Sequence, residues 1–209
     1  MAVIDYGIGN LRSAEKALQR MGGDARLSND PAFIRTADAV VLPGVGAFGA
    51  CMAALRAGGL EDGVHDAVAS GRPFLGICVG MQMLFDRSEE DPRIRGLGVI
   101  PGTVTWIPAG VKRPQMQWNQ LEVTRAAEPM LHGLTPVPGE PIWMYFVHSL
   151  HGVPADADHV AATCDYGGDL NVAFRSGNVF ATQFHPEKSG PSGLALLGNF
   201  VAAAGSIST

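Results

Sequence analysis

The chain has 209 residues, of which 46% are hydrophobic and 17% are charged, and its formal net charge is −5. A chain with this apolar content can bury a substantial core, which excludes disorder as its main state. The acidic balance, without clusters of Lys and Arg, argues against a general nucleic-acid or membrane surface.

Cysteine usage and the first residues indicate the compartment. Cys51, Cys78 and Cys164 are an odd number of cysteines without CxxC spacing, which disfavours a disulfide framework or a zinc site. The opening MAVIDYGIGN lacks the basic flank and the apolar length of a signal peptide. No apolar run approaches the roughly 20 residues that a membrane span needs. We therefore expect a soluble, cytoplasmic protein with reduced thiols and no metal.

The first half of the chain alternates strand and helix patterns. Apolar runs closed by glycine or proline predict buried strands at residues 2–6, 39–42 and 73–77. Helical spacing and start signals predict helices at residues 11–21, from Asp30-Pro31, and at residues 50–57, 60–70 and 81–85, with Asn10 capping the first. Parallel strands require crossover connections, so this alternation predicts a parallel sheet flanked by helices.

After about residue 95 the pattern changes to short, β-rich segments separated by turn signals. They predict strands at residues 103–107, 120–124, 143–148, 159–164, 171–175 and 179–184, followed by a helix at residues 192–203. We therefore expect residues 1–209 to form one α/β domain. Its central sheet would be mixed but mostly parallel, flanked by helices, with an antiparallel extension in the second half.

Cys78 lies between two glycines at the end of a predicted strand, within FLGICVGMQMLF. This pattern resembles the nucleophile elbow of α/β hydrolases with sulfur in place of oxygen. Small neighbours let the backbone pass behind a lifted side chain, and the N-terminus of a following helix favours the thiolate. The alternative is a core thiol, because free Cys is among the most buried residue types. The motif alone leaves both interpretations open.

His185 is the only one of the six histidines with a carboxylate two positions later, at Glu187. In an extended chain such residues point to the same side, and Pro186 favours extended geometry at His185. A carboxylate on one ring nitrogen leaves the other to face a thiol. Alone, the segment is better explained as a turn with solvated side chains. Together with Cys78, it favours a catalytic pair.

The turn Gly44-Val45-Gly46 follows another predicted strand. Residues 44–49 match GxGxxG, but the match does not lie on the first strand and Pro43 interrupts the turn, so we discount a dinucleotide site. We favour a turn whose backbone N–H groups stabilise an oxyanion beside the N–H of Val79. A purely structural glycine turn is the alternative.

These three pieces, in this order, resemble the class I (triad) glutamine amidotransferases, a family with a flavodoxin-like fold. The family has a Pro-Gly-rich oxyanion loop, a Gly-x-Cys-x-Gly elbow and a His-Pro-Glu segment, and the resemblance covers essentially the whole chain. Residues 5–11, 43–48, 145–149 and 185–189 resemble the branch that serves imidazole glycerol phosphate synthase in histidine biosynthesis.

The resemblance implies roles for individual residues. Cys78 would attack the carboxamide of L-glutamine, and His185, oriented by Glu187, would transfer the protons. Backbone N–H groups at Val45 and Val79 would bind the oxyanion. No cofactor is implied.

A substrate pocket and a partner are implied as well. Gln82, Glu90 and the backbone around Ser149 would bind glutamine, although Glu90 alone reads as part of a solvated acidic loop. Released ammonia would pass to a (β/α)8-barrel cyclase subunit, which makes imidazole glycerol phosphate and AICAR. The positions that match this heterodimer contact are Asn10, Arg12, Trp118, Asn119, Tyr145 and Lys188. Trp118 alone is equally compatible with packing at the edge of the core.

The chain departs from the family pattern at residues 115–119, where His-Met-Gly-Trp-Asn is usual and Gln115 and Gln117 occur instead. If that glycine uses a positive φ, Gln117 would strain the loop by roughly 1 kcal/mol or more. Leu150 replaces a common aromatic residue and Val79 a common Leu. Both would act through backbone groups, so we expect little effect.

Other functions fit parts of the pattern. The chain could be the glutaminase of another synthase, such as that of pyridoxal phosphate biosynthesis. From different classes come a non-catalytic interaction module and a thiol-based redox sensor. The complete set of Cys78, His185 and Glu187 favours an enzyme.

Overall fold

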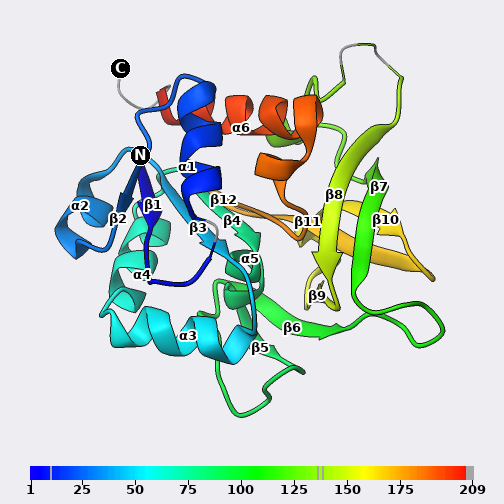
Figure 1. Ribbon diagram of the computed structural model, residues 1–209, viewed down its shortest axis with the longest axis horizontal. Helices are drawn as coiled ribbons and strands as arrows, with labels where there is room; N and C mark the ends of the chain where they lie inside the picture. Colours follow the sequence, from blue (N-terminus) through cyan, green and yellow to red (C-terminus); the bar gives the residue numbers. More distant parts are fainter. Residues whose placement is uncertain (10, 136, 138, 206–209) are drawn as a thin grey trace.

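The computed structural model of the protein describes residues 1–9, 11–135, 137 and 139–205. Asn10, which the sequence predicts as a helix cap and a partner contact, lies outside these residues. A nine-stranded sheet runs through the structure in the order β2-β1-β3-β4-β12-β11-β10-β7-β8 (Figure 1). The five strands from β2 to β12 are mutually parallel, and the strands from β12 to β8 pair antiparallel. The mixed sheet predicted from the sequence is confirmed.

The strands of the large sheet are β1 (Ala2–Ile4), β2 (Arg26–Ser28), β3 (Val40–Gly44), β4 (Phe74–Cys78), β7 (Gln115–Val123), β8 (Ile142–His148), β10 (Val160–Asp165), β11 (Asp169–Ser176) and β12 (Val179–Thr182). Four of them, β1, β3, β4 and β12, are buried along their whole length. Parallel strands covered on both faces are continuous apolar runs, which is the signal that the sequence carried.

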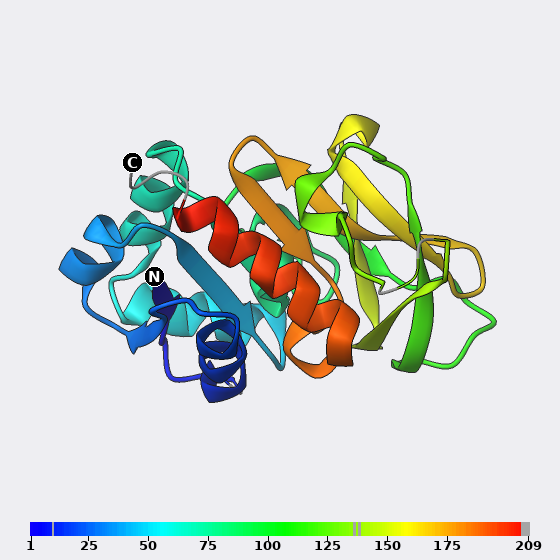
Figure 2. The same ribbon diagram turned by 90° about the horizontal axis from the view of Figure 1, so that it is seen from above.

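Helices cover both faces of this sheet: α1 and α6 lie together on one side, with α3 and α4 on the other, and Figure 2 shows α6 lying across the strands. The helices are α1 (Leu11–Arg20), α2 (Pro31–Thr36), α3 (Phe48–Ala57), α4 (Glu61–Ala69), α5 (Val79–Met83) and α6 (Gly190–Gly205), with short 3-10 helices η1 (Pro129–Leu131), η2 (Ala157–His159) and η3 (Pro186–Lys188). At α2, the Asp30 carboxylate accepts a hydrogen bond from the N–H of Ala32, as the Asp-Pro start signal predicts.

A second, three-stranded sheet was not predicted. It consists of β5 (Phe85–Ser88), β6 (Ile100–Trp106) and β9 (Leu150–Pro154), with β6 between the other two. The prediction of a helix over residues 81–85 is wrong at its end, because α5 stops at Met83 and Phe85 begins β5. The Phe85 ring packs edge-on against Phe174, with 5.3 Å between ring centroids, and this tertiary contact overrides the local apolar helix pattern.

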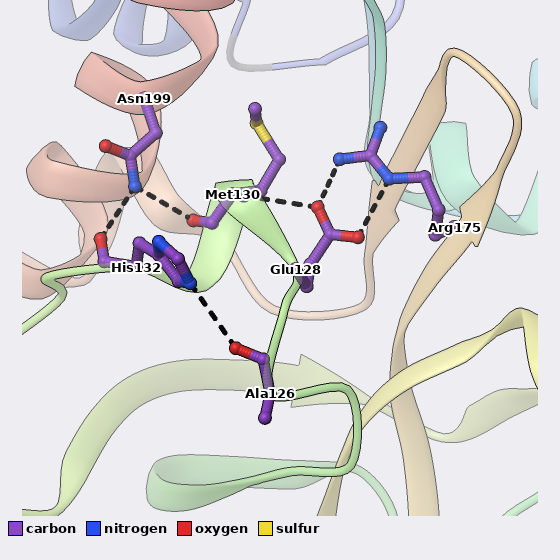
Figure 3. Close-up of polar contacts among 6 residues, drawn as sticks. All are labelled: Ala126, Glu128, Met130, His132, Arg175 and Asn199. Atoms are coloured by element: carbon purple, nitrogen blue, oxygen red, sulfur yellow. Dashed lines mark hydrogen bonds and ion pairs between the residues drawn. The ribbon is translucent and has the colours of Figure 1, made fainter.

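A polar clamp holds η1 between β11 and α6 (Figure 3). The buried Glu128 carboxylate accepts hydrogen bonds from Nε of Arg175 at 2.9 Å, from Nη2 of Arg175, and from the N–H of Met130 at 3.1 Å. Asn199 of α6 donates to the backbone oxygens of Met130 and His132. Both carboxylate oxygens of Glu128 are satisfied, so the clamp is a structural element with no reactive group left over.

Candidate active site

Several hollows among the described residues are large enough to hold a small molecule, and two of them lie at opposite ends of the parallel strands β4 and β12. One, of about 540 Å³, is bordered by Phe74 and Asn178, near the beginnings of β4 and β12, and contains no thiol or imidazole. The other, of about 240 Å³, contains Cys78 and His185 at the ends of the same strands. Ligands of open α/β sheets bind outside the carboxyl ends of the strands, so the second hollow is the candidate site.

Strand register brings the predicted residues to this edge. β3 pairs with β4 so that Gly44 lies beside Cys78, and β12 pairs with β4 so that Thr182 lies beside Ile77. The chain continuing from Thr182 therefore passes Cys78 and reaches His185. Three segments that are far apart in the sequence end next to one another.

Cys78 occupies a strained elbow between β4 and α5. Its φ of 54° and ψ of −114° make it the only non-glycine residue with a positive φ in the described part of the chain. A Cβ on Gly80 would lie 1.9 Å from the carbonyl oxygen of Leu42, and one on Gly76 would lie 2.8 Å from Leu84. The flanking glycines are therefore required by the close approach of backbone and side chains. A strained turn that exposes a nucleophile above a sheet is the arrangement of hydrolase elbows.

His185 is oriented by Glu187, with 2.7 Å between Nδ1 and Oε1 and both side chains buried. Among the described residues, its buried Nε2 has no hydrogen-bond partner. Burial disfavours the charged ring, but the interactions with Cys78 and Glu187 outweigh it and raise the pKa of His185 to about 10. The ring can therefore hold a proton beside a thiolate.

The turn that follows β3 is anchored at three points. The Tyr6 hydroxyl donates to the Pro43 oxygen at 2.7 Å, and the Cys51 thiol donates to the Val45 oxygen at 3.3 Å. Burial raises the pKa of both Tyr6 and Cys51, which keeps these donors protonated. Glu90 provides the third anchor by accepting a hydrogen bond from the N–H of Phe48 at 2.7 Å.

The hollow at Cys78 unites most of the predicted site residues. It is lined by Val45, Gly46, Cys78, Val79, Gln82, Glu90, Pro114, Val147, His148, Ser149, Leu150 and His185. Gly44 and Glu187 lie behind it, around a much smaller hollow of about 10 Å³. Small-ligand pockets typically measure about 300–1,000 Å³, so a volume slightly below this range suits a molecule of amino-acid size.

A buried amide pair that sequence reasoning missed lies next to Cys78. Nε2 of Gln82 donates to Oε1 of Gln183 at 3.0 Å, and Nε2 of Gln183 donates to Sγ of Cys78 at 3.7 Å. Gln183 directly follows β12. Predicting the pairing of β12 with β4 would have placed it beside Cys78.

A second missed network supports the far wall of the hollow. His148 is buried, with Nδ1 2.7 Å from the Leu150 oxygen and Nε2 2.8 Å from the Gln115 amide. Burial lowers the pKa of His148 to about 4, so the ring is neutral and carries one donor. If Nδ1–H donates to Leu150, Nε2 must accept from the NH2 group of Gln115. Cys164 also interacts with the Gln115 side chain, and burial raises the pKa of its thiol to about 12.

The residues expected at a partner contact do not all lie together. Trp118 and Tyr145 are paired across β7 and β8, with 6.2 Å between ring centroids. A Cβ on Gly190, two residues after the exposed Lys188, would lie 3.8 Å from the Trp118 ring. Asn119 lies at the adjoining position of β7 and donates to the Asp165 oxygen. Arg12 is exposed on α1.

Gln117 does not strain its segment. It pairs with Phe146 inside the regular β7–β8 ladder, and it is absent from the positive-φ residues of the described chain. The strain considered for this position therefore does not arise.

Within the described ranges, no group of three or more His, Cys, Asp or Glu side chains could hold a metal ion. Of the helices in these ranges, none is both long and apolar enough to cross a membrane.

The fold and the site define the class of protein. A family model for the class I glutamine amidotransferases matches residues 2–204, so the chain belongs to that family. A solved glutamine amidotransferase superposes with a TM-score of 0.75 at 26% identity, covering 98% of each chain. The family and the fold predicted from the sequence are confirmed.

Curated relatives of nearly the same length are subunits of one enzyme. The imidazole glycerol phosphate synthase subunit HisH of Syntrophotalea carbinolica is 49% identical over 207 residues, which cover 96% of this chain and 98% of the relative. The subunit of the same name from Methanothermobacter thermautotrophicus is 48% identical over 201 residues, covering 96% and 97% of the two chains.

Proposed function

We propose that the chain is the glutaminase subunit of an imidazole glycerol phosphate synthase and hydrolyses L-glutamine to L-glutamate and ammonia. The observation that carries this proposal is Cys78 in a strained elbow beside the His185–Glu187 pair, at a hollow of amino-acid size. The near full-length similarity to subunits of that synthase supports the choice of pathway.

The reaction follows from the positions of three groups. The Cys78 thiolate attacks the carboxamide carbon, and the carbonyl electrons move to an oxyanion bound by the N–H groups of Val45 and Val79. His185 gives its proton to the amide nitrogen, the C–N bond breaks, and ammonia leaves a glutamyl thioester. Water then attacks while His185 accepts its proton, the C–S bond breaks, and glutamate and the thiolate are released.

The substrate head group would be held by polar side chains that line the hollow. Gln82 and Glu90 line the hollow with amide and carboxylate oxygens that suit an ammonium group. The backbone at Ser149 would complete the site for the carboxylate. Glu90 also accepts from Phe48 at the start of α3, so substrate binding and the oxyanion turn share one residue.

Ammonia would pass directly to a (β/α)8-barrel cyclase subunit in the cytoplasm, because in water it would be protonated and lost. The docking face would include Trp118 and Tyr145, a pair of exposed and half-exposed aromatic rings on adjacent strands, with Lys188 at its edge. Arg12, exposed on α1, would be a separate contact. Aromatic residues are enriched at the energetic centres of protein interfaces.

Glutamine turnover tests the proposal. The chain with its cyclase should release glutamate, the chain alone should be much slower, and Cys78→Ala should be inactive while still binding the cyclase. Glutamine hydrolysis by Cys78→Ala would refute the thioester mechanism. Equal turnover with and without the cyclase would refute the coupling, and stable co-purification with a pyridoxal phosphate synthase barrel instead would refute the choice of pathway.

A further inference from the structure

Gln183 reaches Cys78 as a direct result of strand pairing. β12 runs parallel to β4 and ends with Thr182 beside Ile77, so the next residue along β12 lies beside Cys78. The N–H of Gln183 donates to the Val172 oxygen of β11 at 2.8 Å, which fixes the backbone there. Because strand side chains alternate between faces, Gln183 and His185 emerge on the same side of the sheet.

The side chain of Gln183 is completely buried and bridges two site residues. Its NH2 group points at Sγ of Cys78, with 3.7 Å between the two atoms, and its oxygen accepts from Nε2 of Gln82 at 3.0 Å. The direction of these two hydrogen bonds is fixed by the sulfur at which they end, because a thiolate accepts hydrogen bonds and donates none. Reversing both amides would aim a carbonyl oxygen at the sulfur.

We propose that Gln183 is a further catalytic residue, which donates a hydrogen bond to the Cys78 thiolate and orients Gln82 towards the substrate; the second role rests on the proposed glutaminase function. The donor stabilises the anionic sulfur before attack. It acts again when the C–S bond of the thioester breaks and the sulfur recovers its negative charge. A neutral thioester sulfur is a much weaker acceptor, so the interaction favours the thiolate over the acylated state.

The same amide links the nucleophile to substrate binding. With its NH2 group committed to Gln183, Gln82 presents its carbonyl oxygen to the hollow, where the glutamine ammonium group can donate to it. Substrate contact with Gln82 therefore polarises the two amides in series, and their effect ends at the sulfur of Cys78.

The test is the pH dependence of Cys78 alkylation by iodoacetamide, followed by mass spectrometry in the chain bound to its cyclase. In Gln183→Met, which has similar length and no donor, the pH of half-reaction should rise by roughly one to two units, the equivalent of a lost hydrogen bond to a charged group. Gln183→Glu should raise it further, since it keeps an acceptor for Gln82 but places a carboxylate beside the sulfur. Thiolate is the species that reacts.

Steady-state kinetics separate the two roles. Both variants should lose roughly 10- to 100-fold in kcat, which is about 1.4–2.7 kcal/mol at about 1.36 kcal/mol per tenfold. KM should rise more in Gln183→Met than in Gln183→Glu, because only the glutamate still accepts from Gln82. Thr182→Val is the matched control at the position next to Gln183. It removes a buried hydroxyl that donates to the Phe184 oxygen, and it should leave the alkylation profile unchanged.

An unchanged pH of half-reaction in Gln183→Glu or Gln183→Met would overturn the proposal, as would an equal shift in Thr182→Val. Alkylation requires no turnover, so it stays informative if the proposed function fails. In that event the wild-type complex would not hydrolyse glutamine, yet the Gln183 variants would still shift the profile.

Discussion

The left-handed backbone of Cys78 costs of order 1–3 kcal/mol for a residue with a side chain. It persists because the surrounding contacts leave no alternative path for the chain. Gly80 is central to this, since its missing Cβ is the space through which the Leu42 carbonyl approaches α5. The backbone strain at Cys78 and the close packing behind it therefore have the same structural cause.

Gly80→Ala should therefore destabilise the protein by about 3 kcal/mol or more, because the added methyl group meets rigid backbone. Urea unfolding followed by circular dichroism measures this. Gly63→Ala is the matched control in the interior of α4, where a Cβ would make an ordinary 3.6 Å contact with Ile34. It should raise stability by about 0.5–1 kcal/mol through helix propensity, and the idea fails if the two variants behave alike.

The neutral state of His148 makes stability depend on pH. Its pKa of about 4 in the fold lies below the ordinary value of 6.5. The stability that the neutral His148 ring contributes is therefore complete above pH 6.5 and is lost as the pH falls towards 4. The free energy of unfolding changes there by up to about 1.4 kcal/mol per pH unit.

His148→Asn, which does not titrate, should lack this part of the slope. Urea unfolding between pH 7 and 4.5 compares the two proteins, and the difference isolates His148 because His151, whose pKa burial also lowers, remains in both. Parallel stability curves would contradict a buried neutral ring at His148.

At the residue scale, short motifs drew attention to Cys78, His185 and Glu187, although neither motif was decisive alone and only their combination favoured a catalytic set. Gln183 carries no such motif: it lies 105 positions from Cys78, and its role depends on the register of two strands. His148 looked like one more residue of an alternating strand. Buried polar networks are created by tertiary contacts, so a sequence pattern cannot show their partners.

Among the elements, β8 is joined directly to the segment that carries His185. The Tyr145 oxygen accepts from the N–H of His185 at 3.1 Å, and the N–H of Tyr145 donates to the Ser189 hydroxyl at 2.9 Å. That hydroxyl in turn donates to the His185 oxygen at 2.6 Å. A displacement of β8 at the proposed docking face would therefore move the imidazole.

Ser189→Ala should weaken this connection. It leaves the N–H of Tyr145 and the oxygen of His185 without their hydroxyl partner, which costs about 1–3 kcal/mol of stability. We expect kcat in the cyclase complex to fall several-fold with little change in KM. Thr36→Val, which removes an exposed hydroxyl on α2, is the control and should leave kcat unchanged. A wild-type kcat in Ser189→Ala would rule out this route.

The elements that the sequence predicts carry a local signal, either a continuous apolar run or a β-rich segment between turn residues. The sequence-based prediction missed β2, β5 and β9 for identifiable reasons. β2 has three residues and none is buried, so it has no strand pattern. β5 and β9 belong to the small sheet, whose strands are joined by long-range pairing with β6.

At the scale of the whole molecule, the β7–β8 ribbon has an exposed aromatic face. Trp118 is 48% exposed and lies beside Tyr145. If this face docks the cyclase, Trp118→Ala should weaken the complex by about 30-fold or more in Kd, the size of an interface hot spot. Isothermal titration calorimetry measures it, with Trp106→Ala, which removes an exposed tryptophan of the three-stranded sheet, as control. Equal affinities would move the docking face elsewhere.

The same ribbon has a consequence for the isolated chain. Alternate positions of β7 and β8 place Trp118 and Trp143, both close to half exposed, on the side where Met116 is 62% exposed. A contiguous apolar patch of this kind promotes self-association when nothing covers it. We therefore expect the chain made alone to aggregate as its concentration rises, and to remain monodisperse when synthesised together with its partner. The partner would then act as a solubility factor for its own source of nitrogen.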